Sequence, residues 1–192
     1  MPRAGLDAHV VVGRASALID EHGVEALTLA RVAGELGVAT PSLYKHVGGL
    51  DDLIGRVAVA ATAEFAAQLG AASRGRSGRR ALEAIADAYR RFAREHPGTY
   101  PLTQRHRGTD AWTAAAAEGI TAVVTALSGY GVEEGDVHRI RVVRSALHGF
   151  VDLERSGGFG LPTSVDESFA VLVDALDATL RTLDAAGAVS PR

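Results

Sequence analysis

The amino-acid sequence predicts an all-α protein. Apolar residues recur three and four positions apart along most of the 192-residue chain, which is the period of an amphipathic helix. Threonine, aspartate, proline and glycine, the residues that begin and end helices, separate these segments. No stretch longer than a few residues alternates apolar and polar positions as a strand does, and no internal repeat is visible.

The composition is that of a globular protein with a substantial core. Apolar residues make up 47% of the chain, and the net charge of −3 gives no overall attraction to nucleic acid. The absence of cysteine excludes disulfides, thiolate metal sites and a cysteine nucleophile. The longest apolar runs are alanine-rich and fall short of the roughly 20 residues of a membrane span. The N-terminus lacks the features of a signal or transit peptide, so we expect a cytoplasmic protein without a membrane segment.

Two helices are expected near the N-terminus. Apolar positions from Val11 to Ile19 share one face, and the sequence HG at 22–23 supplies a stop. Thr28 can cap a second helix, because its hydroxyl can accept a hydrogen bond from a free amide of the first turn. That helix is expected to end at Gly37.

A third short helix follows the linking turn GVA. Thr40 is its expected cap and Pro41 its first residue, where the missing N–H of proline is harmless. Leu43 and Val47 lie four apart and should form the packing face. Two short helices joined by a glycine-containing turn are typical of a helix-turn-helix, whose second helix lies in the major groove of DNA. An ordinary solvated helical hairpin would show the same spacing.

The third helix carries side chains that suit DNA contacts. Hydroxyl, lysine and histidine groups can bind phosphates or base edges, and a proline can contact a thymine methyl. Lys45 is the only lysine in the chain. The residues of this stretch with such chemistry are Thr40, Pro41, Ser42, Tyr44, Lys45 and His46.

The remaining sequence predicts further helices separated by two glycine-rich loops. The loops are expected at 70–80 and at 157–162, where small and polar residues replace the helical pattern. Acidic residues at 51 and 52 suit the first turn of the helix that follows the third one. The expected helices cover residues 51–69, 82–93, 102–106, 110–128, 134–155 and 165–185.

The segment TLARVAGELGVATPSLYKHVGGLDDLI at 28–54 resembles the DNA-binding motif of the tetracycline-repressor (TetR) family. The resemblance implies a homodimer of about nine helices per chain, with a helix-turn-helix domain at 1–56 and a ligand-binding and dimerisation domain at 57–192. It places Thr28 and Arg31 near the DNA backbone. It places at the DNA itself the residues Thr40, Pro41, Ser42, Tyr44, Lys45 and His46.

Two positions depart from the family pattern. The small capping residue of many members is Ala39 here, which moves the expected cap to Thr40. The lysine that many members use to bind a phosphate before the fourth helix is Leu50. Residues 1–56 also hold five Lys or Arg against seven acids, so we expect modest electrostatic affinity for DNA and a shallow salt dependence.

The stretch RSALHGFVDLERSGGFGLPTSVDESFAVLVDAL at 144–176 resembles a subgroup of TetR C-terminal domains with an HGF, LE, GGFG, D and SF pattern, the WHG type. Apolar stripes on the last two helices leave surface for a second copy, and the resemblance implies that this surface is buried in a two-fold four-helix bundle, although the core of one chain would show the same stripes. Gly149 costs about 1 kcal/mol relative to alanine, which favours a close approach there. The residues assigned to the dimer interface are Val143, Leu147, Gly149, Phe150, Phe169, Leu172, Val173, Leu176 and Leu180.

The family resemblance also implies a small-molecule inducer in an apolar cavity of the C-terminal domain. Aromatic and histidine residues there are candidate contacts, although an aromatic residue at helical spacing is more often part of the core and a buried histidine is more often structural. They include no lysine or arginine cluster, so the expected inducer is small and largely apolar or aromatic. The residues assigned to ligand binding are Phe65, Tyr89, Phe92, His96, Tyr100, Trp112 and His148.

Enzyme motifs are missing from the sequence. It has no HExxH or GxSxG, and the glycines of GGFG follow a helix, where they make a poor phosphate cradle. We therefore expect no catalytic residues, no metal and no cofactor. The favoured function is a ligand-responsive repressor that binds a pseudo-palindromic DNA operator. The alternatives are a helical ligand-binding protein that has lost DNA binding and an activator of the same family.

Overall fold

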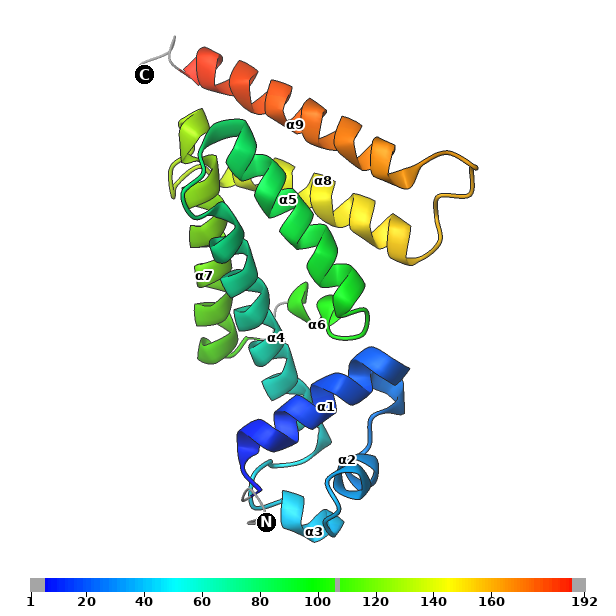
Figure 1. Ribbon diagram of the computed structural model, residues 1–192. Coiled ribbons are helices and arrows are strands. Elements are labelled where there is room, and N and C mark those ends of the chain that lie inside the picture. Colours follow the sequence, from blue (N-terminus) through cyan, green and yellow to red (C-terminus); the bar gives the residue numbers. More distant parts are fainter. Residues whose placement is uncertain (1–5, 106–107, 188–192) are drawn as a thin grey trace. The chain divides into compact units, whose positions relative to one another are not determined.

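The computed structural model describes residues 6–105 and 108–187, with side chains up to Asp184 (Figure 1). All regular structure in these ranges is helical, with nine α-helices and two short 3-10 helices, so the all-α prediction is confirmed. The chain forms two compact units. The first holds the residues up to Glu64 together with 96–116, and the second holds 65–95 together with the chain from Ala117 onward.

The first unit is built from four α-helices, one 3-10 helix and the beginnings of two longer helices. Asp7 caps α1 by accepting a hydrogen bond from the Val10 amide at 2.8 Å. The hydroxyl of Thr28 accepts from the Arg31 amide at 3.1 Å, which confirms it as the cap of α2. The elements of this unit are α1 (Ala8–His22), η1 (Val24–Ala26), α2 (Leu29–Glu35), α3 (Thr40–Leu43), the start of α4 (Leu50–Ser73), α6 (Tyr100–Thr103) and the start of α7 (Asp110–Leu127).

Residues far apart in the sequence share the core of the first unit. Val11 and Ile19 of α1 are completely buried, as are Leu43 and Leu53. Trp112 of α7 packs into the same cluster. This packing explains why residues 96–116 belong to the first unit although they follow α5 in the sequence.

The second unit is organised around α5 (Gly78–Glu95). Helices α8 (Val137–Arg155) and α9 (Val165–Gly187) each pack against α5 and against one another. The end of α4, the end of α7 and η2 (Ser128–Tyr130) complete the unit. Its fully buried side chains include Phe92, Leu82, Leu147 and Leu180.

Three predicted boundaries differ from the observed ones. The loop expected at 70–80 is much shorter, because α4 continues to Ser73 through two alanines and α5 already begins at Gly78. The short helix expected at 102–106 lies at 100–103, with Pro101 in its first turn. The helix expected from residue 134 begins at Val137, where the side chain of Asp136 caps it.

Helix α7 has the length and composition of a membrane-crossing segment, with a mean hydropathy of 1.2 over residues 110–130. The apolar character comes largely from alanine. Glu118 lies near the middle and is exposed, and a charged side chain at the centre of a bilayer costs about 2.5–3.5 kcal/mol on insertion scales. This charge disfavours a role as a membrane span.

A buried arginine joins the three main helices of the second unit. Arg90 of α5 donates two hydrogen bonds to Glu154 of α8, at 2.8 and 2.6 Å, and lies 2.7 Å from a carboxylate oxygen of Asp166 of α9. Its guanidinium also lies 4.6 Å from the ring centre of Phe169. Bidentate and cation–π contacts of this kind are the stronger forms of each interaction.

The residues of the HGF, LE and GGF pattern meet at this arginine. The ring of Phe150 lies 4.9 Å from that of Phe159 and 5.1 Å from that of Phe169, and Arg90 covers Phe150 at 5.7 Å. Glu154 is the acid of the LE pair. The spacing of the pattern therefore has a physical explanation. Its acid and its aromatic residues come together around Arg90, which is not itself part of the sequence pattern.

Replacing Glu154 by glutamine should destabilise the protein by roughly 2 kcal/mol, because Arg90 would keep a buried charge with only part of its pairing. The hydrogen bonds from Arg90 lower the pKa of Glu154. Its contribution is therefore complete near neutral pH and is lost as the pH falls below about 4.3, the ordinary glutamate pKa.

Urea unfolding at neutral and acidic pH would measure both effects. The matched control is Asp152→Asn on the same helix, whose side chain is exposed and should change stability little. Equal losses in the two variants would contradict the role of Glu154.

Candidate nucleic-acid interface

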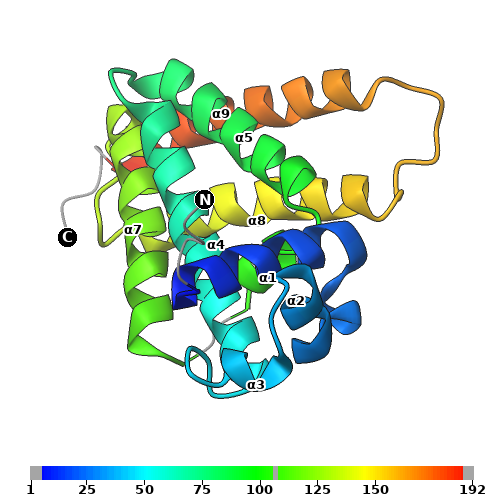
Figure 2. The same cartoon turned by 60° about the horizontal axis from the view of Figure 1, so that its bottom comes forward.

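Helices α2 and α3 form a helix-turn-helix whose turn depends on a glycine. Gly37 has φ of 66°, a conformation that glycine adopts without strain, and it ends α2 as predicted. The Val38 amide then donates to the Ala33 carbonyl at 3.0 Å, which closes the turn. Figures 1 and 2 show α3 beside α2 at an outer end of the first unit.

The third helix begins one residue earlier than predicted. Ala39 is its N-cap and Thr40 its first helical residue, and the Ser42 amide donates to the Ala39 carbonyl at 2.9 Å. The expectation that Thr40 caps the helix is therefore wrong. The extended backbone of Ala39 turns the chain without a side-chain bond, so the Thr40 hydroxyl is not used as a cap.

The packing face of α3 is as predicted. Leu43 is fully buried and Val47 is 2% exposed. The Val47 amide donates to the Leu43 carbonyl at 3.0 Å, so the helical turn continues past the end of α3 proper. Two buried anchors four residues apart hold the residues between them outward.

The structure brings the eight residues predicted to contact DNA onto or beside α2 and α3. Tyr44 is 60% exposed, and Lys45 and Pro41 are also exposed. Thr28 is exposed, but its hydroxyl already serves as the cap of α2. The others are partly exposed, namely Arg31, Thr40, Ser42 and His46.

Some basic residues of the first unit form ion pairs, and others do not. Arg14 pairs with Glu35, and Arg56 pairs with Asp52 at 2.9 Å. In the part of the chain that the structure describes, Arg31 and Lys45 form no ion pair. Two cations of the described chain that form no ion pair are therefore among the residues predicted to contact DNA.

The start of α4 is stabilised by Asp52 and carries leucine, not lysine, at position 50. Asp52 accepts a hydrogen bond from the Gly48 amide at 2.8 Å, which is the main reason that its pKa is lowered. Leu50 is partly buried and packs on the core of the first unit. The position where the family pattern has lysine therefore supports the fold and offers no charge to a phosphate.

Asp20 of α1 binds the segment that leads into α6. Its carboxylate accepts hydrogen bonds from the amides of Gly98 and Thr99, at 3.0 and 2.7 Å, and lies 3.1 Å from Nδ1 of His96. A Cβ atom on Gly98 would lie 1.9 Å from the Ile19 carbonyl oxygen, so only glycine fits there. The sequence offered no sign of this contact, because its partners are 76 to 79 residues apart.

The predicted ligand contacts divide between the two units. Phe65, Tyr89 and Phe92 are buried together in the second unit, with ring centres 4.9 and 4.7 Å apart from that of Phe65. His148 of α8 is partly buried in the same unit. The three that lie in the first unit are His96, Tyr100 and Trp112.

A surface groove of about 590 Å³ lies along α4 and α5, and none of the seven predicted ligand residues lines it. Its lining residues are mostly charged or small. The sequence prediction looked for aromatic residues around a ligand and therefore missed this groove. Within residues 6–105 and 108–187, no group of three His, Asp or Glu side chains is placed to hold a metal ion.

The residues predicted for the dimer interface are mostly covered within one chain. Six of the nine are buried against the chain's own helices, namely Val143, Leu147, Phe169, Val173, Leu176 and Leu180. Phe150 and Leu172 are partly exposed, and Gly149 is exposed. Packing inside the chain therefore explains the two stripes, since α8 and α9 turn these faces toward each other and toward α5.

Comparisons with known proteins agree along the chain. Residues 12–57 match the family described as bacterial regulatory proteins, tetR family, and residues 82–176 match the tetracyclin repressor-like C-terminal domain. The uncharacterized HTH-type transcriptional regulator YobS of Bacillus subtilis (strain 168) is 33% identical over 174 residues, covering 88% of this chain and 90% of that protein. The uncharacterized HTH-type transcriptional regulator Rv0681 of Mycobacterium tuberculosis is 35% identical over 158 residues, covering 80% and 72%.

A solved structure shows the same fold. It is a TetR variant from Acinetobacter baumannii AYE in complex with minocycline, with a TM-score of 0.68 and 22% sequence identity. The match covers 94% of this chain and 99% of that one.

Replacing Asp20 by alanine should cost about 2 kcal/mol of stability, because two backbone amides would lose their acceptor. Hydrogen exchange should accelerate at the amides of Gly98 and Thr99 while the centre of α5 stays protected. The control is Glu21→Ala, which removes an exposed neighbouring acid. Unchanged exchange at both amides in the Asp20 variant would contradict the contact.

Proposed function

Because the chain belongs to the TetR family of bacterial transcriptional regulators, we propose that it is a homodimeric repressor that binds a pseudo-palindromic operator and is released by a small, largely apolar ligand. The protein acts in the cytoplasm and has no catalytic role. We also assign its C-terminal domain to the WHG-type subgroup, since the residues of that pattern gather at Arg90.

The observation that supports DNA binding most is the geometry of α3. The buried side chains of Leu43 and Val47 fix the turn, and Tyr44 and Lys45 between them are exposed. An aromatic hydroxyl and an unpaired ammonium group at this position suit phosphate or base-edge contacts in the major groove. The helix itself is one turn long, so its first residues and the turn after it provide the contact surface.

The outer faces of α8 and α9 are the proposed dimer surface. Val142 and Leu153 of α8 are 43% and 50% exposed, and Val171 of α9 is 67% exposed. Gly149 lies on the same outer face of α8, and a side chain there would meet nothing within its own chain. An isologous contact between two copies would bury these apolar residues and hold two α3 helices about 34–36 Å apart for successive major grooves.

The ligand response is proposed to act through α4 and the segment held by Asp20. Helix α4 contributes residues to both units, and Phe65, at the aromatic cluster with Tyr89 and Phe92, follows directly after the unit boundary. The Acinetobacter TetR variant is in complex with minocycline, which supports a small-molecule site in this fold. To release DNA, the ligand must bind one conformation more tightly than the other, because equal affinity shifts nothing.

A second candidate is a helical ligand-binding protein that has lost DNA binding. Leu50 in the place of the phosphate-binding lysine and the excess of acids over bases in residues 1–56 favour it. Activation instead of repression is a matter of where the operator lies relative to the promoter, and DNA binding itself would be the same.

Replacing Lys45 by alanine should weaken operator binding roughly tenfold and reduce the salt dependence by about one counterion if the ammonium meets a phosphate. Fluorescence anisotropy on labelled DNA from upstream of the protein's own gene, with scrambled competitor, would measure this. Tyr44→Ala should weaken binding as well, whereas Arg74→Ala, which removes an exposed charge from the second unit, should not. If no sequence from a random DNA library binds the wild-type protein in preference to others, the second candidate function would be supported.

Replacing Val171 by glutamate should convert the dimer to a monomer, because the two-fold contact would bury an unpaired charge from each chain. Light scattering coupled to size exclusion would report the mass. Ile120→Glu is the control, since Ile120 is 49% exposed but lies on α7. A Val171 variant that remains dimeric at low concentration would place the interface elsewhere.

A further inference from the structure

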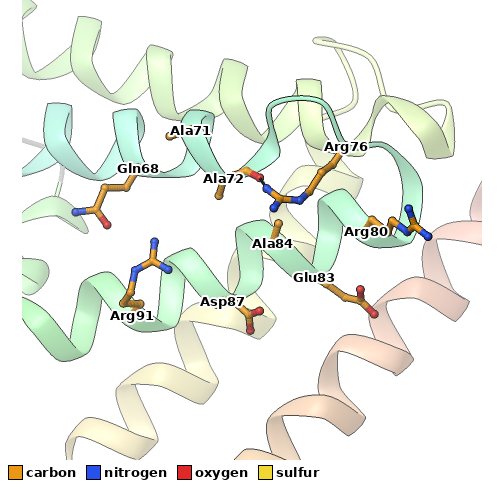
Figure 3. Close-up of a pocket in the computed structure, with 9 residues that line it drawn as sticks. All are labelled: Gln68, Ala71, Ala72, Arg76, Arg80, Glu83, Ala84, Asp87 and Arg91. Atoms are coloured by element: carbon orange, nitrogen blue, oxygen red, sulfur yellow. Dashed lines mark hydrogen bonds between the residues drawn. The ribbon is translucent and has the colours of Figure 1, made fainter.

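The groove along α4 and α5 is lined by side chains that suit an anion. Arg76 enters it from the turn after α4, Arg91 enters it from α5, and Arg80 lines it at the other end of α5 (Figure 3). Alanines of both helices form the rest of the wall, so the arginines surround a space that no large side chain fills. The volume of about 590 Å³ is within the range of small-molecule sites, roughly 300–1,000 Å³.

Two of these arginines are outside the ion pairs of the described chain, although the charge of Arg91 acts on nearby Asp87. In the ranges that the structure describes, Arg80 and Arg91 form no ion pair. Arg76 donates to the Ala72 carbonyl and keeps its other N–H groups. Arginine is suited to carboxylate and phosphate groups, because its planar fork presents several donors at once.

The acids of the groove do not cancel this charge. Glu83 is bound to Arg79 at 2.7 Å, and Figure 3 shows its carboxylate pointing away from α4. Asp87 is the second acid, against three arginines on the lining. The groove therefore has an excess of positive charge although the whole chain is acidic.

Gln68 supplies a polar group to the lining of the groove. Its Oε1 atom is buried and has no hydrogen-bond partner. Figure 3 shows its side chain reaching from α4 toward Arg91 of α5. A buried amide oxygen without a hydrogen-bond partner has a free-energy cost. Rotation of the amide would turn its N–H groups to an anion, which removes that cost.

We propose that this groove binds a small di- or trivalent anion carrying carboxylate or phosphate groups, held by Arg80 and Arg91 with Arg76 and Gln68 beside them. Arg80 and Arg91 lie three helical turns apart, about 16 Å along α5 from the rise per residue. Their long, flexible side chains can turn toward one another across this span, so a compact ligand with several anionic groups matches them better than a single charge does. A hydroxyl between them can donate to Asp87. This site is separate from the aromatic cluster proposed for the inducer, and it does not depend on the protein binding DNA.

The chain provides its own reporter for this site. It contains only two glutamines, Gln68 and Gln104, and no asparagine, so ¹⁵N-labelled protein shows only two side-chain amide pairs of this kind. Gln68 lines the groove, and Gln104 donates to the Thr103 hydroxyl in the first unit. Citrate and pyrophosphate are the two probes, with carboxylate and phosphate groups respectively, and acetate at matched ionic strength is the comparison.

Titration of the full-length protein with either probe should shift the Gln68 amide pair saturably and leave the Gln104 pair in place. Acetate should bind far more weakly. Arg80→Ala and Arg91→Ala should each raise the Kd at least about tenfold, since each removes a charge-assisted pair without adding a side-chain amide. Arg74→Ala removes an exposed arginine outside the groove and should change the Kd less than about twofold.

Several results would overturn the proposal. They are a Gln68 pair that does not move, equal movement of both glutamine pairs, and equal weakening by Arg74→Ala and the groove variants. Backbone spectra of each variant would show that it is folded. Two groove variants from opposite ends of the site keep the test decisive if one of them does not fold. Saturation by citrate alone or by pyrophosphate alone would support the site and identify which acid group it prefers.

Discussion

The charge of Arg90 has to be neutralised inside the second unit, and this requirement determines how the unit packs. Its side chain is 8% exposed, and a guanidinium does not lose its proton at any pH the protein meets. Glu154 arrives from a position 64 residues later along the chain, and Asp166 follows at the start of α9. Because these partners lie on two helices, one ion network sets the position of α5 against both α8 and α9. The aromatic rings of the α8–α9 region then cover the guanidinium, which keeps water from competing for its hydrogen bonds.

This inward packing leaves a second apolar surface on the same two helices. The faces of α8 and α9 that meet α5 carry Leu147 and Leu180, both buried. Val142 and Val171 lie on the outer faces and remain exposed. A helix that is apolar on two sides has more apolar surface than one chain can cover, which is why a second copy of the chain is the partner we propose for the outer side. The inner apolar faces of α8 and α9 therefore stabilise the chain's own fold, and the outer apolar faces are the surface that we propose for the second copy.

The first unit depends on a smaller hydrogen-bond network, which also joins segments that are far apart in the sequence. Asp20 holds two amides of the segment before α6, and Trp112 adds its ring to the core around α1. The unit that holds the helix-turn-helix is therefore not formed by the N-terminal residues alone, because residues 96–116 contribute to its core and hydrogen bonds. A change in the segment at 96–103 would therefore reach α1 directly through the carboxylate of Asp20.

The sequence by itself determined the helical class, the caps at Thr28 and Gly37, the buried pair Leu43 and Val47, and the exposed residues between that pair. These features depend on neighbours within one or two turns, and a period of 3.6 residues records them. The exact start of α3 was not available from this pattern, because the cap at Ala39 uses backbone conformation without a side-chain bond. Only the tertiary structure decided which apolar stripe faces the chain's own core, since periodicity records that a face is apolar but not what covers it. The partners of Arg90 and Asp20 and the arginine groove of α4 and α5 were decided there too, because each joins side chains that the sequence separates and the fold brings together.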